Sequence, residues 1–478
     1  MSLAIDLRAV LPEMLVAALA MAVLLWDALA GARGRRVLAP VTVLGLAAAA
    51  ASVLWVGLRP PAFAGAYLRD AATQLLQGIA LLSAALATLL SADYLRRADL
   101  ERGEYYALLL FACLGAMVMA AAGDLIVLFL GLETLSIPLY VLAAFRRGNV
   151  RSQEAGMKYF LLGSFSTAFF LYGVALLYGA SGSTGLAALA QATAAGMTPL
   201  LGIGVALLSI GLAFKAALVP FHAWAPDVYE GAPLPVTAYM AVVAKVGAFA
   251  AVLRAFPLAL PGLAGQWMVV LAVLAMATMV LGNLVALVQR SMKRLLAYSS
   301  IAHAGYLLIG VAAGTAEGAW AMVFYLVAYL FMTLGAFSVV LLLQRAGEEA
   351  DLIEEYAGLG GRAPWLAAAM AVFMVSLAGL PPTGGFIGKF YLFSAALGAG
   401  QPALALVGVL TSVVSVYYYL RVPYLMFAGR DVGGMEVVRA PGVRAVLVTA
   451  VAAVILLGVL PGALTQAVHP LVDLFGAR

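Results

Sequence analysis

The sequence predicts an all-α, polytopic membrane protein with about fourteen transmembrane helices, two of which are broken. Of the 478 residues, 65% are hydrophobic and only 10% are charged. A soluble domain is about half apolar and about a quarter charged. The excess of apolar side chains is too large for one protein core, so lipid must surround much of the chain.

Fourteen stretches are apolar enough to cross a bilayer, which takes about 20 residues. They cover residues 8–30, 37–57, 71–93, 104–122, 124–143, 152–179, 198–229, 233–256, 265–288, 295–314, 317–343, 364–398, 402–428 and 443–463. Only the gaps at 180–197 and 345–362 are long enough for extra structure, and neither can hold a soluble domain. Residues 1–478 are therefore predicted to form a single membrane domain.

The basic residues predict the orientation. Arginines and lysines gather in the odd-numbered loops, whereas the even-numbered loops hold little beyond Arg59, Arg69 and Arg254. The positive-inside rule places the odd loops in the cytoplasm, so both termini are expected outside it. The net charge of +5 does not indicate nucleic-acid binding, because the basic residues form no single patch.

Two spans, 198–229 and 364–398, are too long for a simple crossing. Pro220 interrupts the first, and Pro381 and Pro382 interrupt the second. Proline removes a backbone donor and breaks the helix. Backbone groups freed at membrane depth persist only where protein or a polar cavity covers them.

Broken helices at matching places in two halves are typical of transporters built from inverted repeats, with ion sites at the breaks. Five spans separate the two breaks in this chain. The spacing predicts two five-helix units, which cover about residues 104–256 and 265–428.

Lysine and arginine are sorted differently along the chain. Four of the five lysines lie inside apolar spans, namely Lys158, Lys215, Lys245 and Lys389, whereas nearly all arginines lie in loops or at helix ends. Lysine can lose its proton when it is desolvated, and arginine cannot readily do so. The sorting therefore favours a protein that passes protons through its interior. For Lys158, near the start of its span, snorkelling to the interface is the alternative.

An acid and a histidine complete the candidate site. Glu133 lies near the middle of its span, where an uncompensated carboxylate must bind a proton or a cation. An acid–lysine pair in a bundle is a coupled titrating unit, and a static ion pair that fixes packing is the alternative. His303 has Ser299, Ser300 and Tyr306 on nearby turns, so it is interpreted as a proton carrier between Lys245 and the lysine of the second break.

Other polar residues are interpreted as structural. Asp227 and other acids at helix ends are expected to be caps or interface residues, and Tyr417, Tyr418 and Tyr419 are expected in packing or in an aromatic belt. No cysteine cluster, haem-spaced histidine pair or phosphate-binding loop appears. The sequence predicts no metal site and no redox centre in this chain, so the driving force must come from partners or from another gradient.

Five stretches resemble the antiporter-like subunit N family of bacterial NADH–quinone oxidoreductase, the respiratory complex I. They are residues 131–140, 157–164, 214–233, 293–303 and 380–390, and the similarity covers nearly the whole chain. The related L and M types usually differ at 224–229, where this chain reads Trp-Ala-Pro-Asp-Val-Tyr. The chain also ends soon after its last span, without the lateral helix of the L type.

The resemblance implies two inverted five-helix repeats in a bacterial cytoplasmic (inner) membrane. It implies a proton relay made of Glu133, Lys158, Lys215, Lys245, His303 and Lys389. In this relay Glu133 and Lys215 form the acid–lysine pair, and Lys389 exchanges protons with the outlet side.

The resemblance also implies partners. FMN, iron–sulfur clusters and quinone are expected in other subunits, and M-type and K-type membrane subunits are the expected neighbours. A cation/proton antiporter subunit or a membrane-bound hydrogenase subunit is the alternative, since neither needs different relay residues. A purely structural membrane anchor is disfavoured, because an anchor needs neither sorted lysines nor broken helices.

Overall fold

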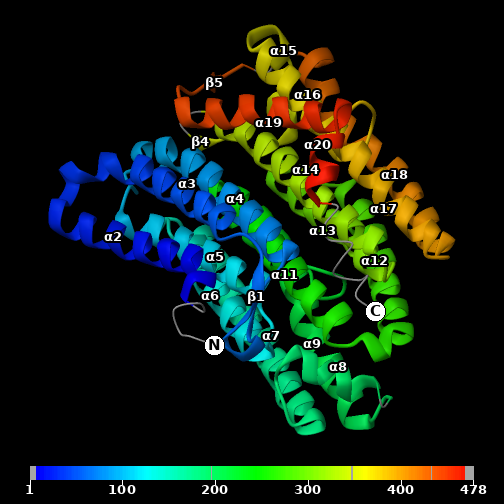
Figure 1. Cartoon of the computed structure of the whole chain (residues 1–478). Helices are drawn as coiled ribbons and strands as arrows, with labels where there is room; N and C mark the ends of the chain where they lie inside the picture. Colours follow the sequence, from blue (N-terminus) through cyan, green and yellow to red (C-terminus); the bar gives the residue numbers. More distant parts are fainter. Residues whose placement is uncertain (1–6, 195, 346–347, 432, 469–478) are drawn as a thin grey trace.

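The computed structural model describes residues 7–194, 196–345, 348–431 and 433–468, which form a bundle of long helices (Figure 1). Within this part of the chain, thirteen helices are long and apolar enough to cross a membrane. The consecutive helices α16 (Pro364–Ala378) and α17 (Gly384–Gly398) supply a further, broken span. The predicted all-α polytopic fold is confirmed.

The long helices follow the predicted spans to within a few residues. They are α2 (Leu11–Gly34), α3 (Leu38–Val56), α4 (Ala71–Arg97), α5 (Gly103–Ala121), α6 (Leu125–Ala143), α7 (Val150–Ser181), α9 (Pro199–Ala216), α11 (Leu234–Leu253), α12 (Ala264–Ala286), α13 (Met292–Ala312), α14 (Ala316–Leu341), α18 (Pro402–Ala428) and α19 (Pro441–Val459).

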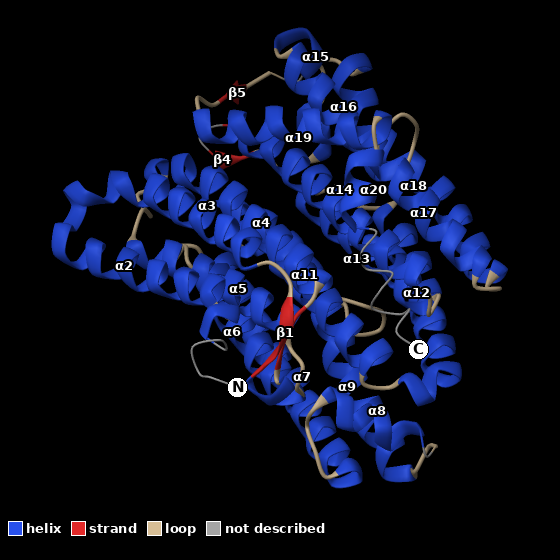
Figure 2. Cartoon of the chain, in the orientation of Figure 1, coloured by secondary structure: helices blue, strands red, loops and turns tan. Residues whose placement is uncertain are grey.

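Short elements fill the connections, as Figure 2 shows. The helices are α8 (Leu186–Ala194), α10 (Trp224–Gly231), α15 (Leu359–Arg362) and α20 (Gly462–Val468). A hairpin pairs β1 (Arg59–Ala62) with β2 (Tyr67–Arg69), and a three-stranded sheet has the order β4 (Glu348–Glu349), β3 (Leu343–Arg345), β5 (Met435–Val437). The sequence analysis did not predict these strands, because each is too short to show an alternating pattern.

Local sequence explains where several helices begin. A side chain before the first turn accepts a hydrogen bond from a free backbone N–H in α4, α6, α7, α9 and α13, the capping residues being Asp70, Asp124, Asn149, Thr198 and Ser291. Such caps satisfy backbone donors that have no partner inside the helix.

Both predicted breaks are present. In the seventh span, α9 ends at Ala216, Ala217 adopts a left-handed conformation with φ 57°, and α10 begins at Trp224. In the twelfth span, α16 ends at Ala378 and Gly379 adopts φ 83° before α17. The left-handed residue ends the helix in each case.

The helices pack in a repeated pattern. In the first group, α5 lies along α6, α7 packs against α6, α9 and α10, and α11 contacts α5 and α9. In the second group, α12 lies along α13, α14 packs against α13, α16 and α17, and α18 contacts α12 and α17. Helices α11, α13 and α14 are buried over nearly their whole length and form the axis where the groups meet.

Two arginines that the sequence places in outer loops, Arg69 and Arg254, are buried. Arg254 donates to both carboxylate oxygens of Asp70, at 2.6 and 2.7 Å. Burial raises the pKa of the Asp70 carboxyl, but the charge and hydrogen bonds of Arg254 outweigh this effect and hold the pKa below its usual value. This pair joins α4 to the C-terminal end of α11.

Candidate functional site

Lys215 lies in the last turn of α9, next to the first break, and is only 4% exposed. Its Nζ donates to the hydroxyl of Ser136 at 2.8 Å and to that of Tyr159 at 3.4 Å. The ring of Tyr159 stacks on Trp224, with centroids 4.4 Å apart. The indole N–H of Trp224 donates to the carbonyl of Phe214 in the last turn of α9, which also accepts from the backbone N–H of Ala217. The first lysine is therefore held by two hydroxyls.

Glu133 approaches Lys215 without a direct ion pair in the described structure. It is half-buried on α6, and its carboxylate accepts from Thr167 at 2.7 Å. Glu133 lies one helical turn from Ser136, so both face the same side of α6. Ser136, Thr167 and Lys215 also line one cavity of about 10 Å³, near the smallest size that holds a water molecule. The hydroxyl partners of the acid and of the lysine therefore line the same small cavity.

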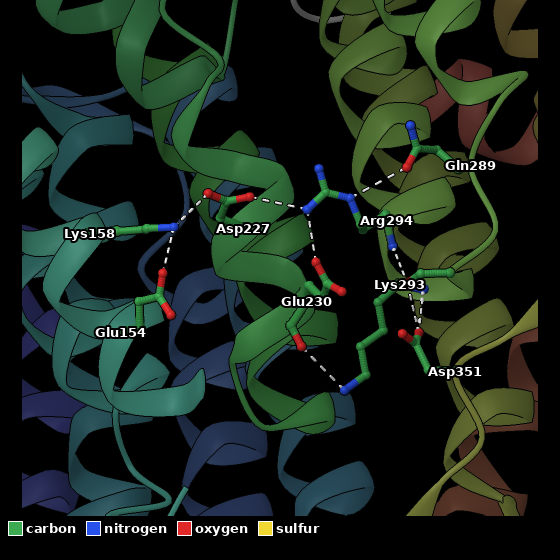
Figure 3. A network of polar contacts seen from close by, with 9 residues as sticks. Glu154, Lys158, Asp227, Glu230, Gln289, Lys293, Arg294 and Asp351 are labelled. Carbon is green, nitrogen blue, oxygen red and sulfur yellow. Dashed lines mark hydrogen bonds and ion pairs between the residues drawn. The ribbon is translucent and has the colours of Figure 1, made fainter. Parts of the chain in front are cut away.

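Lys158 is not buried with the other lysines, since 43% of its side chain is exposed. It pairs with Glu154 at 2.7 Å and with Asp227 at 2.9 Å (Figure 3). Asp227 also pairs with Arg294 of α13 at 3.1 Å, and Arg294 pairs with Glu230 at 2.8 Å. Asp227, interpreted above as a cap or interface residue, therefore connects α7 to α13.

This charged cluster lines a cavity of about 220 Å³ next to α7 and α10. The sequence-based orientation puts it at the cytoplasmic end of these helices. Figure 3 shows the acids and bases alternating from α7, over α10, to α13. Lys158 thus lies at an accessible mouth, and the other three lysines of the predicted relay lie inside the bundle.

Lys245 lies on the buried helix α11 and is 3% exposed. Its Nζ has one hydrogen-bond acceptor, the hydroxyl of Ser300 at 2.5 Å, and lies 5.4 Å from the ring centroid of Tyr329. The Ser300 hydroxyl also contacts the hydroxyls of Tyr329, at 2.9 Å, and Tyr229, at 3.2 Å. Lys245 is thereby joined to α10, α13 and α14.

His303 has a hydrogen-bond partner on each ring nitrogen. Nδ1 lies 2.6 Å from the Tyr325 hydroxyl and Nε2 lies 3.0 Å from the Tyr419 hydroxyl. Tyr419 also contacts Ser299, the neighbour of the serine that holds Lys245. A neutral imidazole with a donor and an acceptor on opposite sides can take up a proton at one nitrogen and release one at the other.

A second polar branch connects the histidine region to Lys389. Tyr418 donates to the side-chain carbonyl of Asn283 at 2.9 Å, and Asn283 donates to the Tyr306 hydroxyl at 3.2 Å. Tyr306 donates to Thr411 at 3.2 Å, next to the serine that contacts Lys389. All of these side chains except Ser412 are at most 7% exposed.

Sequence reasoning missed most of this hydroxyl scaffold. Tyr418 and Tyr419 are buried at 2% and 1% exposure, and only Tyr417 faces outward, at 66%. Successive residues of an α-helix differ by about 100° around its axis, so the three tyrosines cannot share one environment. The helical period was the signal in the sequence that could have shown that these tyrosines face different surroundings.

Lys389 lies on α17, directly opposite the end of α16, and is 3% exposed. Its Nζ donates to the carbonyls of Leu377 and Ala378, at 3.1 and 3.0 Å, and to the Ser412 hydroxyl at 2.8 Å. Among the described residues, no group of His, Cys, Asp and Glu side chains is arranged to hold a metal ion.

A family model described as NADH:quinone oxidoreductase/Mrp antiporter matches residues 122–415. The NADH-quinone oxidoreductase subunit N of Trichlorobacter lovleyi is 47% identical over 469 residues, which cover 97% of this chain and 96% of that protein. The chain belongs to the NADH-quinone oxidoreductase subunit N family. The subunit N of Rhodospirillum rubrum is 43% identical over 94% of each chain.

Solved structures agree with membership in the subunit N family. A chain of respiratory complex I from Thermus thermophilus with bound aureothin superposes with a TM-score of 0.82 at 40% identity, covering 96% of this chain and 99% of that one. A chain of a membrane-bound sulfane sulfur reductase, an archaeal respiratory membrane complex, gives 0.86 at 27% identity, covering 98% and 97%. The subunit N fold thus extends to a related respiratory complex.

Proposed function

We propose that this chain translocates protons as a membrane subunit of a bacterial NADH–quinone oxidoreductase. The observation that carries the proposal is the chain of buried polar groups from Tyr229 to Lys389, which includes Lys245 and His303. Isolated ionisable groups are costly inside a membrane and usually mark an ion or proton pathway. Membership in the subunit N family supports the choice of complex.

The proposed relay uses Glu133, Lys158, Lys215, Lys245, His303 and Lys389. Protons enter at the charged mouth around Lys158 and reach Lys215, whose charge responds to Glu133. They continue through Lys245 and His303 to Lys389, by way of the hydroxyl scaffold and water. Conformational or electrostatic change that arrives from a neighbouring subunit shifts the balance between Glu133 and Lys215.

The proposed architecture consists of two repeats, residues 104–256 and 265–428, of opposite membrane orientation. The repeated packing of α5–α11 and α12–α18 supports this division. A unit of five spans ends on the opposite side of the membrane from its start. The next unit therefore begins on that opposite side and has the inverted orientation. Both termini then lie outside the cytoplasm of a bacterium whose inner membrane holds the chain.

The redox chemistry is assigned to other subunits. FMN, iron–sulfur clusters and quinone are proposed to bind partner chains, and M-type and K-type membrane subunits are the proposed neighbours. This chain contributes the proton path, without a redox centre of its own, to the proton-translocating activity of the complex.

The test uses the assembled complex, purified and reconstituted into liposomes. We expect Glu133→Gln and Lys215→Met to lower proton translocation per NADH oxidised, because each removes one partner of a coupled pair. The outward-facing Tyr417→Phe is the control and should change nothing. Normal proton translocation by either relay variant, in a complex that assembles and reduces quinone, contradicts the proposal.

A cation/proton antiporter subunit is the second candidate, because the matching family model includes the Mrp antiporter. A chain of the Mrp complex of Dietzia also shares the fold, with a TM-score of 0.82 at 24% identity over 98% of each chain. Co-purification from native membranes distinguishes the two. Flavin and iron–sulfur subunits with active quinone reduction support the first candidate, and sodium-dependent proton release without them supports the second.

A further inference from the structure

The end of α16 leaves two backbone carbonyls without backbone donors. The N–H groups of Gly379 and Leu380 turn back to the carbonyls of Ser376 and Val375, as in a Schellman-type helix end. The next two carbonyls, of Leu377 and Ala378, point past the end of the helix. A buried carbonyl without a partner is costly, and a helix C-terminus carries partial negative charge.

The Lys389 ammonium occupies this position. It has three N–H donors, and three acceptors receive them: the two carbonyls and the Ser412 hydroxyl, all within 3.1 Å. Ser412 in turn donates to the carbonyl of Ala378 at 3.0 Å. The Nζ also lies 4.5 Å from the ring centroid of Tyr306, within the range of a cation–π contact.

Gly379 makes room for the cation. A Cβ atom added at this position would lie 2.7 Å from Cδ and 3.2 Å from Nζ of Lys389. Glycine therefore serves both the left-handed turn and the close approach of the lysine side chain. Three oxygen acceptors, an aromatic face and this space form one enclosure for a primary ammonium.

Lys215 and Lys245, the other two buried lysines of the proposed relay, lack such an enclosure. The buried Lys293 is paired with Glu349 instead. Lys245 has a single acceptor, and the two acceptors of Lys215 are side-chain hydroxyls, one of them at 3.4 Å. The arrangement at Lys389 is therefore a property of the second break and not of buried lysines in general.

A cavity leads to the enclosure. It has a volume of about 310 Å³ and is lined by Ala378, Gly379, Lys389, Phe390, Ser412 and Val413 among others. Phe390 and Val413 are 55% and 65% exposed, so the cavity opens at the surface of the bundle. The cavity is large enough for a small organic cation. When the lysine side chain is absent, such a cation can reach the carbonyls through it.

We propose that the carbonyls of Leu377 and Ala378, the Ser412 hydroxyl and the Tyr306 ring form a binding site for a small primary ammonium, with the Lys389 ammonium as its tethered occupant. The proposal concerns cation binding and does not require that the chain translocates protons. A tethered ligand excludes free ones because its effective concentration is high. The site is therefore closed to other ammonium ions in the native protein.

The test uses the purified complex that carries Lys389→Ala, which removes a group equivalent to propylammonium. Equilibrium dialysis with radiolabelled propylammonium should reveal one saturable site that is missing from the unaltered complex. Tetramethylammonium has the same charge but no N–H donor, so it should not compete. Adding Ser412→Ala should weaken binding by about tenfold, the effect of losing one hydrogen bond to a charged group.

Lys389→Met is the matched control, because its side chain fills the same space without the ammonium and should bind no propylammonium. No saturable binding to an assembled Lys389→Ala complex, or equal competition by tetramethylammonium, overturns the proposal. If Lys389→Ala prevents assembly, propylammonium in the growth medium should restore it and tetramethylammonium should not. Failure of that rescue also overturns the proposal, whereas the role in proton translocation is decided separately by Glu133→Gln and Lys215→Met.

Discussion

The first and second breaks place the backbone carbonyls of their helix ends against different partners. After α16, the carbonyls of Leu377 and Ala378 receive the ammonium of Lys389. After α9, the carbonyl of Phe214 receives the indole N–H of Trp224, and Lys215 points instead at two hydroxyls. The charge at the second break thus completes the helix end, whereas the charge at the first break is separate from the backbone.

The difference matters for how each lysine can respond. Lys215 has Glu133 nearby on α6 and only hydroxyl partners, which can reorient as donors or acceptors. Lys389 is bound to carbonyls, which accept only, so loss of its charge leaves them less well satisfied. We infer that the first break is the adjustable one and that the second break holds its charge in a fixed place.

Removing the two lysines should give the largest difference in stability. Lys389→Met leaves the carbonyl of Leu377 buried without a donor, at about 1–3 kcal/mol, and leaves the carbonyl of Ala378 with only the Ser412 hydroxyl. Lys215→Met instead leaves two hydroxyls that can pair elsewhere. We expect a clear fall in the thermal unfolding temperature of the purified complex for Lys389→Met and a small one for Lys215→Met. Equal losses would mean that the carbonyl contacts do not distinguish the breaks.

Trp224→Phe should destabilise the first break as lysine removal destabilises the second, because each change removes a side-chain donor from a carbonyl at a helix end. The phenyl ring can keep the stacking on Tyr159, but the carbonyl of Phe214 loses the indole donor and keeps only the backbone N–H of Ala217. The loss of this one hydrogen bond should cost about 0.5–1.5 kcal/mol. Thermal unfolding of the complex measures the effect. The matched control is Trp55→Phe, because Trp55 is 74% exposed and should tolerate the change. A stable Trp224→Phe complex would show that the indole is not the cap.

The left-handed residue is alanine after α9 (Ala217) and glycine after α16 (Gly379), so exchanging the residue type at each position should have opposite effects on stability. Gly379→Ala places a Cβ against Lys389 and strains a left-handed residue, so it should destabilise the complex by at least the roughly 1–2 kcal/mol of the backbone cost. Ala217→Gly relieves that cost at the first break and should stabilise it by up to about 1 kcal/mol. The two variants should shift the unfolding temperature of the complex in opposite directions. Shifts of the same sign would contradict the left-handed conformation given to Ala217 and Gly379.

The serine partners of the two lysines give a further comparison, which is made on proton translocation. Ser136→Ala leaves Lys215 with only the 3.4 Å contact to Tyr159, whereas Ser412→Ala leaves Lys389 with two carbonyls. Each change removes one hydrogen bond, worth about 1–3 kcal/mol at a charged group. Proton translocation per NADH should therefore fall more for Ser136→Ala. A larger effect at Ser412 would reverse the proposed roles.

The fold could be predicted from the sequence because lipid imposes a simple pattern. Long apolar runs specified the spans, and proline marked both breaks to within a few residues. Burial of Lys215, Lys245 and Lys389 was also predictable, since each lies deep in an apolar run. These features depend on the local sequence alone.

The partners of those lysines depend on packing between distant segments and were not predictable. Nothing local indicates that Ser300 meets Lys245, or that the end of α16 meets Lys389 on α17. Lys158 lies near the start of its span, and only the structure shows that its side chain extends to Asp227 at an exposed mouth. For the Glu133–Lys215 pair, implied by resemblance alone, the described structure gives separate hydroxyl partners, Thr167 for the acid and Ser136 and Tyr159 for the lysine.

The three consecutive tyrosines of α18 also constrain how the gene for this chain can change. Tyr417 faces outward and its two neighbours face the interior, so the phase of the helix assigns each hydroxyl its surroundings. Deleting a single residue between Thr411 and Tyr417 would rotate the following segment of α18 by about 100°, turning Tyr418 and Tyr419 away from Asn283 and His303. We expect α18 to accept many substitutions on its outer side over evolution, but no insertion or deletion in this stretch.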